Sequence, residues 1–117
     1  MFHLLMRLLG FNRVIVSGGS MSPTYNDGDW LLVKWRAPEQ VKQIPLGRVV
    51  VVERFDRPGI FMVKRLHKSH GELYWVEGDN PQSVDSRQWG WLNQSEIIGV
   101  VKLRMKAVKL TGKRFNK

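Results

Sequence analysis

Short apolar runs, each bounded by turn-forming residues, are the feature that most constrains how this chain can fold. β-Branched and aromatic residues, which favour strands, are frequent within the runs. Gly, Pro, Asn and Asp occupy the intervening stretches, as is typical of turns between strands. The pattern therefore predicts a succession of β-strands. The expected strands span residues 13–17, 29–35, 48–54, 60–67, 73–77 and 97–108.

Two of these runs carry further information on pairing. The turn-forming residues 55–59 predict that the run 60–67 folds back on 48–54 as a hairpin. In the last run, Val101, Leu103, Met105 and Ala107 alternate with basic residues, which predicts a strand with one apolar face. The segment 36–46 has a polar composition with two prolines and is expected to form a surface loop.

The composition indicates a single domain with its own core. A chain of 117 residues with 43% hydrophobic residues is long enough to bury a core without help. It contains no cysteine, which excludes a disulfide framework and a thiolate metal site, and agrees with a reducing compartment. We expect neither a metal nor another cofactor.

A turn of small residues between two apolar runs offers a candidate nucleophile. Ser20 follows Gly18 and Gly19, which free the backbone, and precedes Pro23, which stiffens it. A hydroxyl on such a turn, placed between two strands, could attack a substrate. The alternative is an ordinary Gly/Ser loop, because any turn uses these residue types.

A serine nucleophile needs a proton acceptor within hydrogen-bond reach. The three histidines, His3, His67 and His70, lie in the N-terminal tail or in a charged turn region, so they support a Ser-His-Asp arrangement poorly. Lys64 stands among apolar neighbours, and a lysine removed from water loses its charge more readily. The alternative is a solvent-facing lysine that extends its amine to water, and Lys64 taken alone favours that alternative.

The segment 78–90 is unusually dense in polar groups for a connecting loop. It combines turn formers with two acids, two serines and one arginine within thirteen residues. Its Asp and Arg side chains can pair and hold it rigid. The segment is therefore expected to support the candidate site.

Four blocks of residues follow one another along the chain. They are Ser20-Met21-Ser22-Pro23-Thr24 with Gly28-Asp29; Gly47-Arg48-Val49-Val50-Val51; Lys64-Arg65; and Gly78-Asp79-Asn80 with Ser83, Asp85, Ser86 and Arg87. In order and spacing they resemble the type I signal peptidase family, over residues 14 to about 100. The resemblance implies a compact all-β fold with little helix, a β-barrel catalytic core like that of signal peptidases and repressor peptidases.

The resemblance also implies roles for individual residues. Ser20 would attack the scissile carbonyl and Lys64 would act as general base, with Ser83 orienting the Lys64 amine. Asp85 and Arg87 would pair beneath the site. The supporting loop would also include Gly78, Asp79 and Asn80, and the oxyanion and substrate pocket would include Gly18, Gly19, Met21 and Pro23.

One position departs from part of the family. Some members carry a serine two residues before the nucleophile, where this chain has Gly18. The oxyanion hole is therefore expected to rest on backbone N–H groups, chiefly that of Ser20.

Both ends of the chain are expected to lie outside the catalytic core. We expect a short N-terminal segment at residues 1–12, the peptidase domain at 13–108 and a basic tail at 109–117. The N-terminal run is apolar but shorter than the ~20 residues of a membrane span. It is expected to pack on the core as a short helix or strand, and an interfacial helix on a membrane is the alternative. The net charge of +9, much of it near the C-terminus, suits either a solvated face or contact with anionic lipid or nucleic acid.

These features favour a serine endopeptidase that removes an N-terminal leader from a precursor polypeptide. A compact chain without an anchor is similar to the nickel-type superoxide dismutase maturation proteases, which implies a cytoplasmic enzyme acting on a superoxide dismutase precursor. The first alternative is processing of exported precursors at a membrane surface, with peripheral contact to anionic lipid. The second is a basic β-barrel that binds nucleic acid, which explains the charge and the five tryptophans but not Ser20 and Lys64 together.

Overall fold

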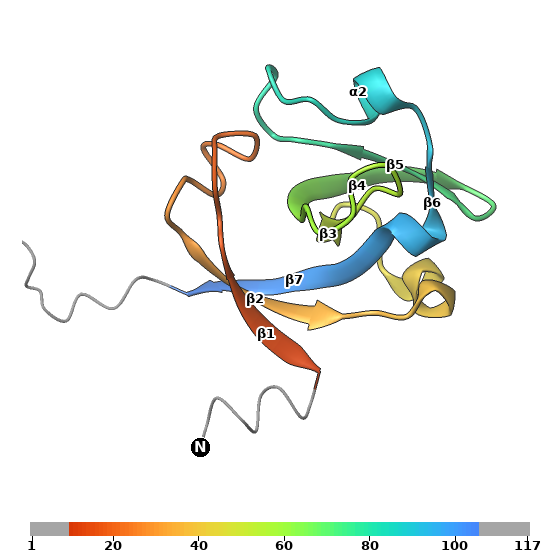
Figure 1. Ribbon diagram of the computed structural model, residues 1–117, viewed down its shortest axis with the longest axis horizontal. Helices are drawn as coiled ribbons and strands as arrows, with labels where there is room; N and C mark the ends of the chain where they lie inside the picture. The colour runs from red at the N-terminus through yellow and green to blue at the C-terminus, as the bar shows by residue number, and fades with distance from the viewer. Residues whose placement is uncertain (1–9, 106–117) are drawn as a thin grey trace, which may run out of the picture.

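A seven-stranded antiparallel sheet makes up most of the computed structural model, which describes residues 10–105 (Figure 1). The strand order is β1-β2-β7-β3-β4-β5-β6. The expected all-β fold with little helix is thereby confirmed. The strands are β1 (Phe11–Ile15), β2 (Trp30–Trp35), β3 (Val49–Val52), β4 (Met62–His70), β5 (Leu73–Glu77), β6 (Leu92–Asn93) and β7 (Ile97–Met105).

Three short helical segments connect the strands. The 3₁₀ helix η1 (Pro38–Gln43) lies within the expected loop 36–46, and its Val41 is fully buried. The helix α2 (Ser86–Trp89) lies within the polar segment 78–90, and the 3₁₀ helix η2 (Gln94–Glu96) leads into β7. No helix within residues 10–105 is long and apolar enough to cross a membrane.

The strand β3 is the centre of the fold and is buried on both faces. Because side chains alternate along a strand, its four valines serve two cores. Val50 and Val52 pack in a first core, formed with β4, β5, β6 and η1. Val49 and Val51 pack in a second core, formed with β2 and the turn that carries Ser20. The site described below lies where elements from these two cores meet.

The hairpin expected between residues 48–54 and 60–67 is confirmed. β3 pairs antiparallel with β4, and Val50 lies opposite Lys64. The expected strands 29–35 and 73–77 agree closely with β2 and β5. β1 begins at Phe11, inside the expected N-terminal segment 1–12. Residues 1–9 of that segment, and the expected tail 109–117, lie outside the described residues.

The alternation expected along the last run is wrong beyond Val101. Val33 of β2 pairs with Val101, but the preceding residue, Leu32, pairs with Leu103, so Lys102 is an extra residue on β7. Such a β-bulge reverses the face on which the following side chains lie. Leu103 is consequently half exposed while Val101 is buried. Ala107 lies outside the described residues.

Candidate functional site

A buried lysine on β4 is the starting point of the site. Lys64 alternates with Val63 and Arg65, and it shares a strand face with Leu66, which lies in the first core. The residue is only 3% exposed. Its Nζ lies 5.7 Å from the ring centroid of Trp89 and donates a hydrogen bond to Ser83 Oγ at 3.0 Å. The solvent-facing alternative for Lys64 is thereby excluded.

Burial changes the chemistry of this amine. Removal from water disfavours the ammonium form and lowers the pKa of Lys64 below its ordinary value. The negative charge of Asp85 acts in the opposite direction and raises the pKa, while the positive charge of Arg87 lowers it further. The net direction is downward, so the neutral amine is more accessible near neutral pH than in an exposed lysine.

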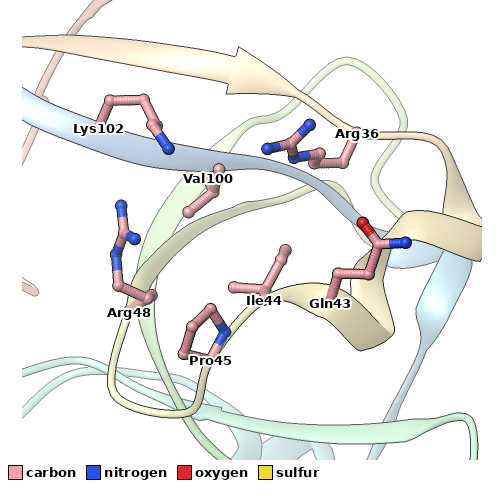
Figure 2. A pocket seen from close by; sticks show the side chains of 7 residues that line it. All are labelled: Arg36, Gln43, Ile44, Pro45, Arg48, Val100 and Lys102. Carbon is pink, nitrogen blue, oxygen red and sulfur yellow. The ribbon is translucent and has the colours of Figure 1, made fainter.

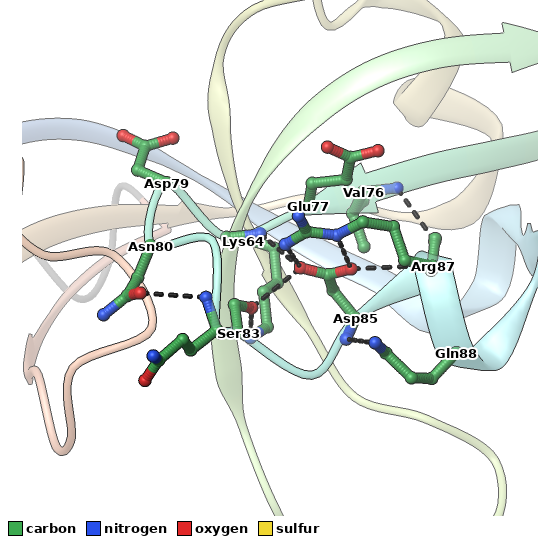
Figure 3. A network of polar contacts seen from close by, with 12 residues as sticks. Lys64, Val76, Glu77, Asp79, Asn80, Ser83, Asp85, Arg87 and Gln88 are labelled. Atoms are coloured by element: carbon green, nitrogen blue, oxygen red, sulfur yellow. Dashed lines mark hydrogen bonds and ion pairs between the residues drawn. The ribbon is translucent and has the colours of Figure 1, made fainter.

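Asp85 connects Ser83 to a network of donors (Figure 3). Ser83 Oγ donates to Asp85 Oδ2 at 2.7 Å, and the Gly78 backbone N–H donates to the same oxygen at 2.7 Å. Arg87 forms a two-pronged pair with the carboxylate, at 2.9 Å to Oδ1 and 2.7 Å to Oδ2. Burial alone would raise the pKa of Asp85, but the donors from Arg87, Gly78 and Ser83 together lower it well below its usual range.

The helix α2 holds this aspartate in place. Asp85 is the N-cap residue, and its side chain accepts a hydrogen bond from the Arg87 backbone N–H. Gln88 Oε1 accepts a hydrogen bond from the Asp85 backbone N–H at 2.8 Å, which completes a capping box. Ser86 Oγ accepts a hydrogen bond from the Val76 N–H and so ties the helix to β5. This helix was not among the elements expected from the sequence, although an Asp followed three residues later by Gln is a recognisable capping signal.

The turn that carries Ser20 is tied to the same loop through backbone contacts. The Asn80 N–H donates to the Ser20 carbonyl at 2.9 Å, and Asn80 Nδ2 donates to the Gly19 carbonyl at 3.0 Å. A Cβ added at Gly78 would overlap both Ser83 Oγ and the Ser20 carbonyl oxygen. The structure therefore brings the backbone of Ser20 beside Gly78 and Ser83, the hydrogen-bond partner of Lys64.

A second arginine–aspartate pair holds the other end of the Ser20 turn. Asp79 accepts two hydrogen bonds from Arg65, at 2.8 and 2.7 Å, and a third from Thr24 Oγ1 at 2.6 Å. Arg65 also donates to the Gly47 carbonyl at 2.8 Å. The hydrogen bonds from Arg65 are the main cause that lowers the pKa of Asp79. This pair therefore connects the Ser20 turn to β4, which carries Arg65, and to the backbone of Gly47.

With this geometry in view, comparisons with known proteins identify the family. The model of the Peptidase S24-like family matches residues 13–102. The chain belongs to the Peptidase S24-like family.

Curated relatives agree with this assignment. The catalytic subunit SEC11 of the signal peptidase complex from Yarrowia lipolytica (strain CLIB 122 / E 150) is 36% identical over 97 residues, covering 76% of this chain and 54% of the relative. SEC11 from Candida albicans (strain WO-1) is 34% identical over 98 residues, covering 76% of this chain and 56% of the relative. The chain thus spans about half the length of these relatives. Membership of a signal peptidase-like family of proteases, expected from the sequence motifs, is confirmed.

The remaining residues expected around the site lie in different environments. Gly18 and Gly19 are exposed at the start of the Ser20 turn, and Gly18 has a positive φ of 89°. Met21 is 1% exposed and packs in the second core, so its side chain fixes the Ser20 turn to that core. Pro23 lies on a groove beside the site.

This groove has a volume of about 470 Å³ and runs between the Ser20 turn and the polar loop. Arg65 and Asp79 of one arginine–aspartate pair line it together with Arg87 of the other, so its walls carry charges of both signs. Its size is within the range of about 300–1,000 Å³ that is common for binding clefts. The lining residues are Pro23, Thr24, Arg65, His67, Glu77, Gly78, Asp79, Pro81 and Arg87.

The histidines take part in other contacts. His67 Nδ1 lies 3.8 Å from Glu77 Oε1 on the groove, and the His70 ring lies 6.4 Å from that of Trp91. His3 lies outside the described residues. Between residues 10 and 105, no group of three His, Asp or Glu side chains is placed to hold a metal ion.

Proposed function

We propose that the chain is a serine endopeptidase in which Ser20 is the nucleophile and Lys64 the general base. The observation that carries the proposal is the buried Lys64 amine, held 3.0 Å from Ser83 Oγ. The Ser20 carbonyl oxygen and Ser83 Oγ both lie next to Gly78, so the Ser20 backbone is close to Ser83. Membership of a peptidase family makes hydrolysis of a peptide bond the reaction to consider first.

The direction of each hydrogen bond supports the role of Lys64 as a base. The Ser83 hydroxyl gives its proton to Asp85, so its oxygen has a free lone pair to accept an N–H from Lys64. A neutral amine oriented in this way has its own lone pair free for another proton donor. In the proposed mechanism that donor is the Ser20 hydroxyl.

The proposed reaction has two stages. Lys64 takes the Ser20 proton as the Ser20 oxygen attacks the scissile carbonyl, and the resulting ammonium returns the proton to the departing amine. The product of this stage is an ester between Ser20 and the leader. Lys64 then takes a proton from water as the water attacks the ester, and passes it to the Ser20 oxygen as the ester bond breaks, which releases the leader acid and free Ser20. The Ser20 backbone N–H is proposed to stabilise the oxyanion.

The Asp85–Arg87 pair is proposed to tune this base. A bare carboxylate near Lys64 would favour the ammonium form, which cannot accept a proton. Arg87 compensates that charge while Asp85 continues to hold Ser83. Ser83, Asp85 and Arg87 are therefore positioning residues in this proposal.

The proposed substrate is a precursor polypeptide with an N-terminal leader, and a nickel-type superoxide dismutase precursor is the finer proposal. It is supported by the compactness of the core, in which only the β4–β5 hairpin separates Lys64 from Gly78. A cytoplasmic location is proposed together with this substrate. A second candidate substrate is a precursor that carries an export signal, because the similar relatives are catalytic subunits of the signal peptidase complex.

The test mixes the purified chain with each precursor and follows release of the leader by mass spectrometry. We expect cleavage of the superoxide dismutase precursor by the wild type, and loss of at least ~1,000-fold in rate for Ser20→Ala and for Lys64→Arg. A guanidinium stays protonated, so arginine cannot act as the base. Equal cleavage by wild type and Ser20→Ala would contradict the proposed nucleophile, and cleavage of the export precursor alone would favour the second candidate.

A further inference from the structure

A small basic pocket lies apart from the candidate site, between η1 and the strands β3 and β7 (Figure 2). Its lining shares no residue with the groove beside Ser20. Its floor is apolar, and polar side chains with three cationic groups surround its rim. The lining residues are Arg36, Gln43, Ile44, Pro45, Arg48, Val100 and Lys102.

The size of the pocket restricts what it can hold. Its volume is about 170 Å³, which is below the ~300 Å³ at which pockets for drug-sized ligands begin. Ile44 and Val100 are nearly fully buried and close its floor. The pocket therefore suits a small group and leaves no room for a folded segment to enter.

The three cationic side chains converge on this pocket from different elements. Arg48 precedes β3, and its Nη2 donates to the Val101 carbonyl at 2.9 Å, which fixes the guanidinium and leaves other N–H groups free. Arg36 follows β2, and its backbone N–H is bonded to the Ile98 carbonyl at 2.9 Å. Lys102 is the extra residue of the β7 bulge, a feature that commonly redirects a side chain. In Figure 2 the side chains of Lys102 and Arg48 lie on one side of Val100 and that of Arg36 lies on the other.

These charges have no anionic partner in the described part of the chain. No ion pair within 4.0 Å involves Arg36, Arg48 or Lys102 among residues 10–105. The sequence outside that range contains no Asp or Glu, so no acidic side chain there can neutralise them. The three positive charges around the partly apolar pocket repel one another. An anion bound in the pocket offsets this repulsion.

We propose that this pocket binds a phosphate group. Arginine presents planar N–H forks that match phosphate oxygens, and a phosphate dianion balances more of the three positive charges than a carboxylate does. The chemistry is shared by inorganic phosphate and by a phosphomonoester headgroup at a lipid surface. The inference does not depend on the proposed peptidase activity.

The first arm of the test uses inorganic phosphate. Binding to the full chain is followed by ¹H–¹⁵N NMR, including the arginine Nε signals, in phosphate and in chloride at equal ionic strength. We expect saturable shifts at Arg36 and Arg48, and about tenfold weaker binding in Arg36→Gln and in Lys102→Gln, because each removes one charge-assisted contact. Arg57→Gln is the matched control, since Arg57 is exposed in the β3–β4 turn and its loss changes the net charge equally.

The second arm distinguishes the source of the phosphate by flotation with vesicles. Neutral phosphatidylcholine vesicles are compared with vesicles that also contain phosphatidic acid, whose headgroup is a phosphomonoester. Binding that Arg36→Gln and Lys102→Gln reduce and Arg57→Gln retains identifies a lipid headgroup. Saturable phosphate binding without this vesicle dependence identifies a free phosphate. Shifts that do not saturate, or equal weakening in all three variants, show a response to overall charge and overturn the proposal.

Discussion

Two arginine–aspartate pairs hold the same polar loop, and they do so in different environments. Asp85 has no exposed side-chain surface, whereas the side chain of Asp79 is 17% exposed (Figure 3). Asp85 accepts a hydrogen bond from Ser83, the partner of Lys64, while Asp79 accepts one from Thr24 on the Ser20 turn. The comparison indicates that the Asp85–Arg87 pair acts on the charge of Lys64, whereas the Asp79–Arg65 pair fixes the position of the Ser20 turn.

The two aspartates should differ most in their effect on stability. Asp85→Ala leaves the Gly78 N–H, Ser83 and Arg87 without their buried acceptor, and we expect the free energy of unfolding to fall by about 3–5 kcal/mol. Asp79→Ala removes a more exposed carboxylate, and about 1–2 kcal/mol is expected. Urea unfolding followed by circular dichroism measures both. Equal losses for the two variants would contradict the difference in environment.

The same aspartates predict how stability depends on pH. Each has a folded-state pKa below its ordinary value, so its contribution is complete above the unfolded pKa of 3.8 and is lost as the pH falls through the folded pKa. Asp85→Asn should therefore lose less stability than the wild type between pH 5 and pH 3. The same urea series at each pH checks the sign, and a steeper decline in the variant would contradict it.

Gly78 links the two pairs, because it directly precedes Asp79 and its N–H binds Asp85. The methyl group added in Gly78→Ala would overlap Ser83 and the Ser20 backbone and would displace one of them. Because a small displacement of the reacting groups can slow a reaction about 100-fold, we expect kcat/KM to fall by about 100-fold. Gly99→Ala is the matched control, since its added methyl also meets close neighbours, Trp35 and Val33 at 3.0 Å, but none of them belongs to the Ser20 turn or the polar loop. A loss in Gly99→Ala as large as that in Gly78→Ala would show that the loss is not specific to the overlap beside Ser20.

The two arginines should differ in the pH profile of activity. Arg87 lowers the pKa of Lys64, so Arg87→Gln raises that pKa and moves the acidic limb of kcat/KM to higher pH. Arg65→Gln loosens the Ser20 turn and is expected to lower kcat without moving the limb. Cleavage rates on a leader peptide between pH 5 and pH 10 distinguish the two. If the acidic limb of kcat/KM moved equally in both variants, the two pairs would not differ in their effect on the pKa of Lys64.

Local sequence patterns were sufficient for part of this fold. The strands β2 and β5 were predicted closely, because turn-forming residues bound each apolar run. The burial of Lys64 was one of two interpretations, and only the packing of β4 against the first core decides between them. Ser83, Asp85 and Arg87 were grouped through a family resemblance and not through geometry.

The features that were missed depend on contacts distant in sequence or on short signals. The bulge at Lys102 arises from the pairing of β7 with β2, which no pattern within 97–108 reveals. The core position of Met21 depends on how the Ser20 turn folds over the second core. The helix α2 has only four residues, but its capping box was legible in the sequence and should have been recognised.

The most direct test of the account is the titration of the Lys64 amine in the wild-type chain. Selective ¹⁵N labelling of lysine allows its Nζ signal to be followed by NMR, with Lys64→Met providing the assignment. We predict that the pKa of Lys64 lies below its ordinary value of 10.5, and that Arg87→Gln raises it. A Lys64 amine that titrates at or above 10.5 in the folded chain would contradict its role as the base.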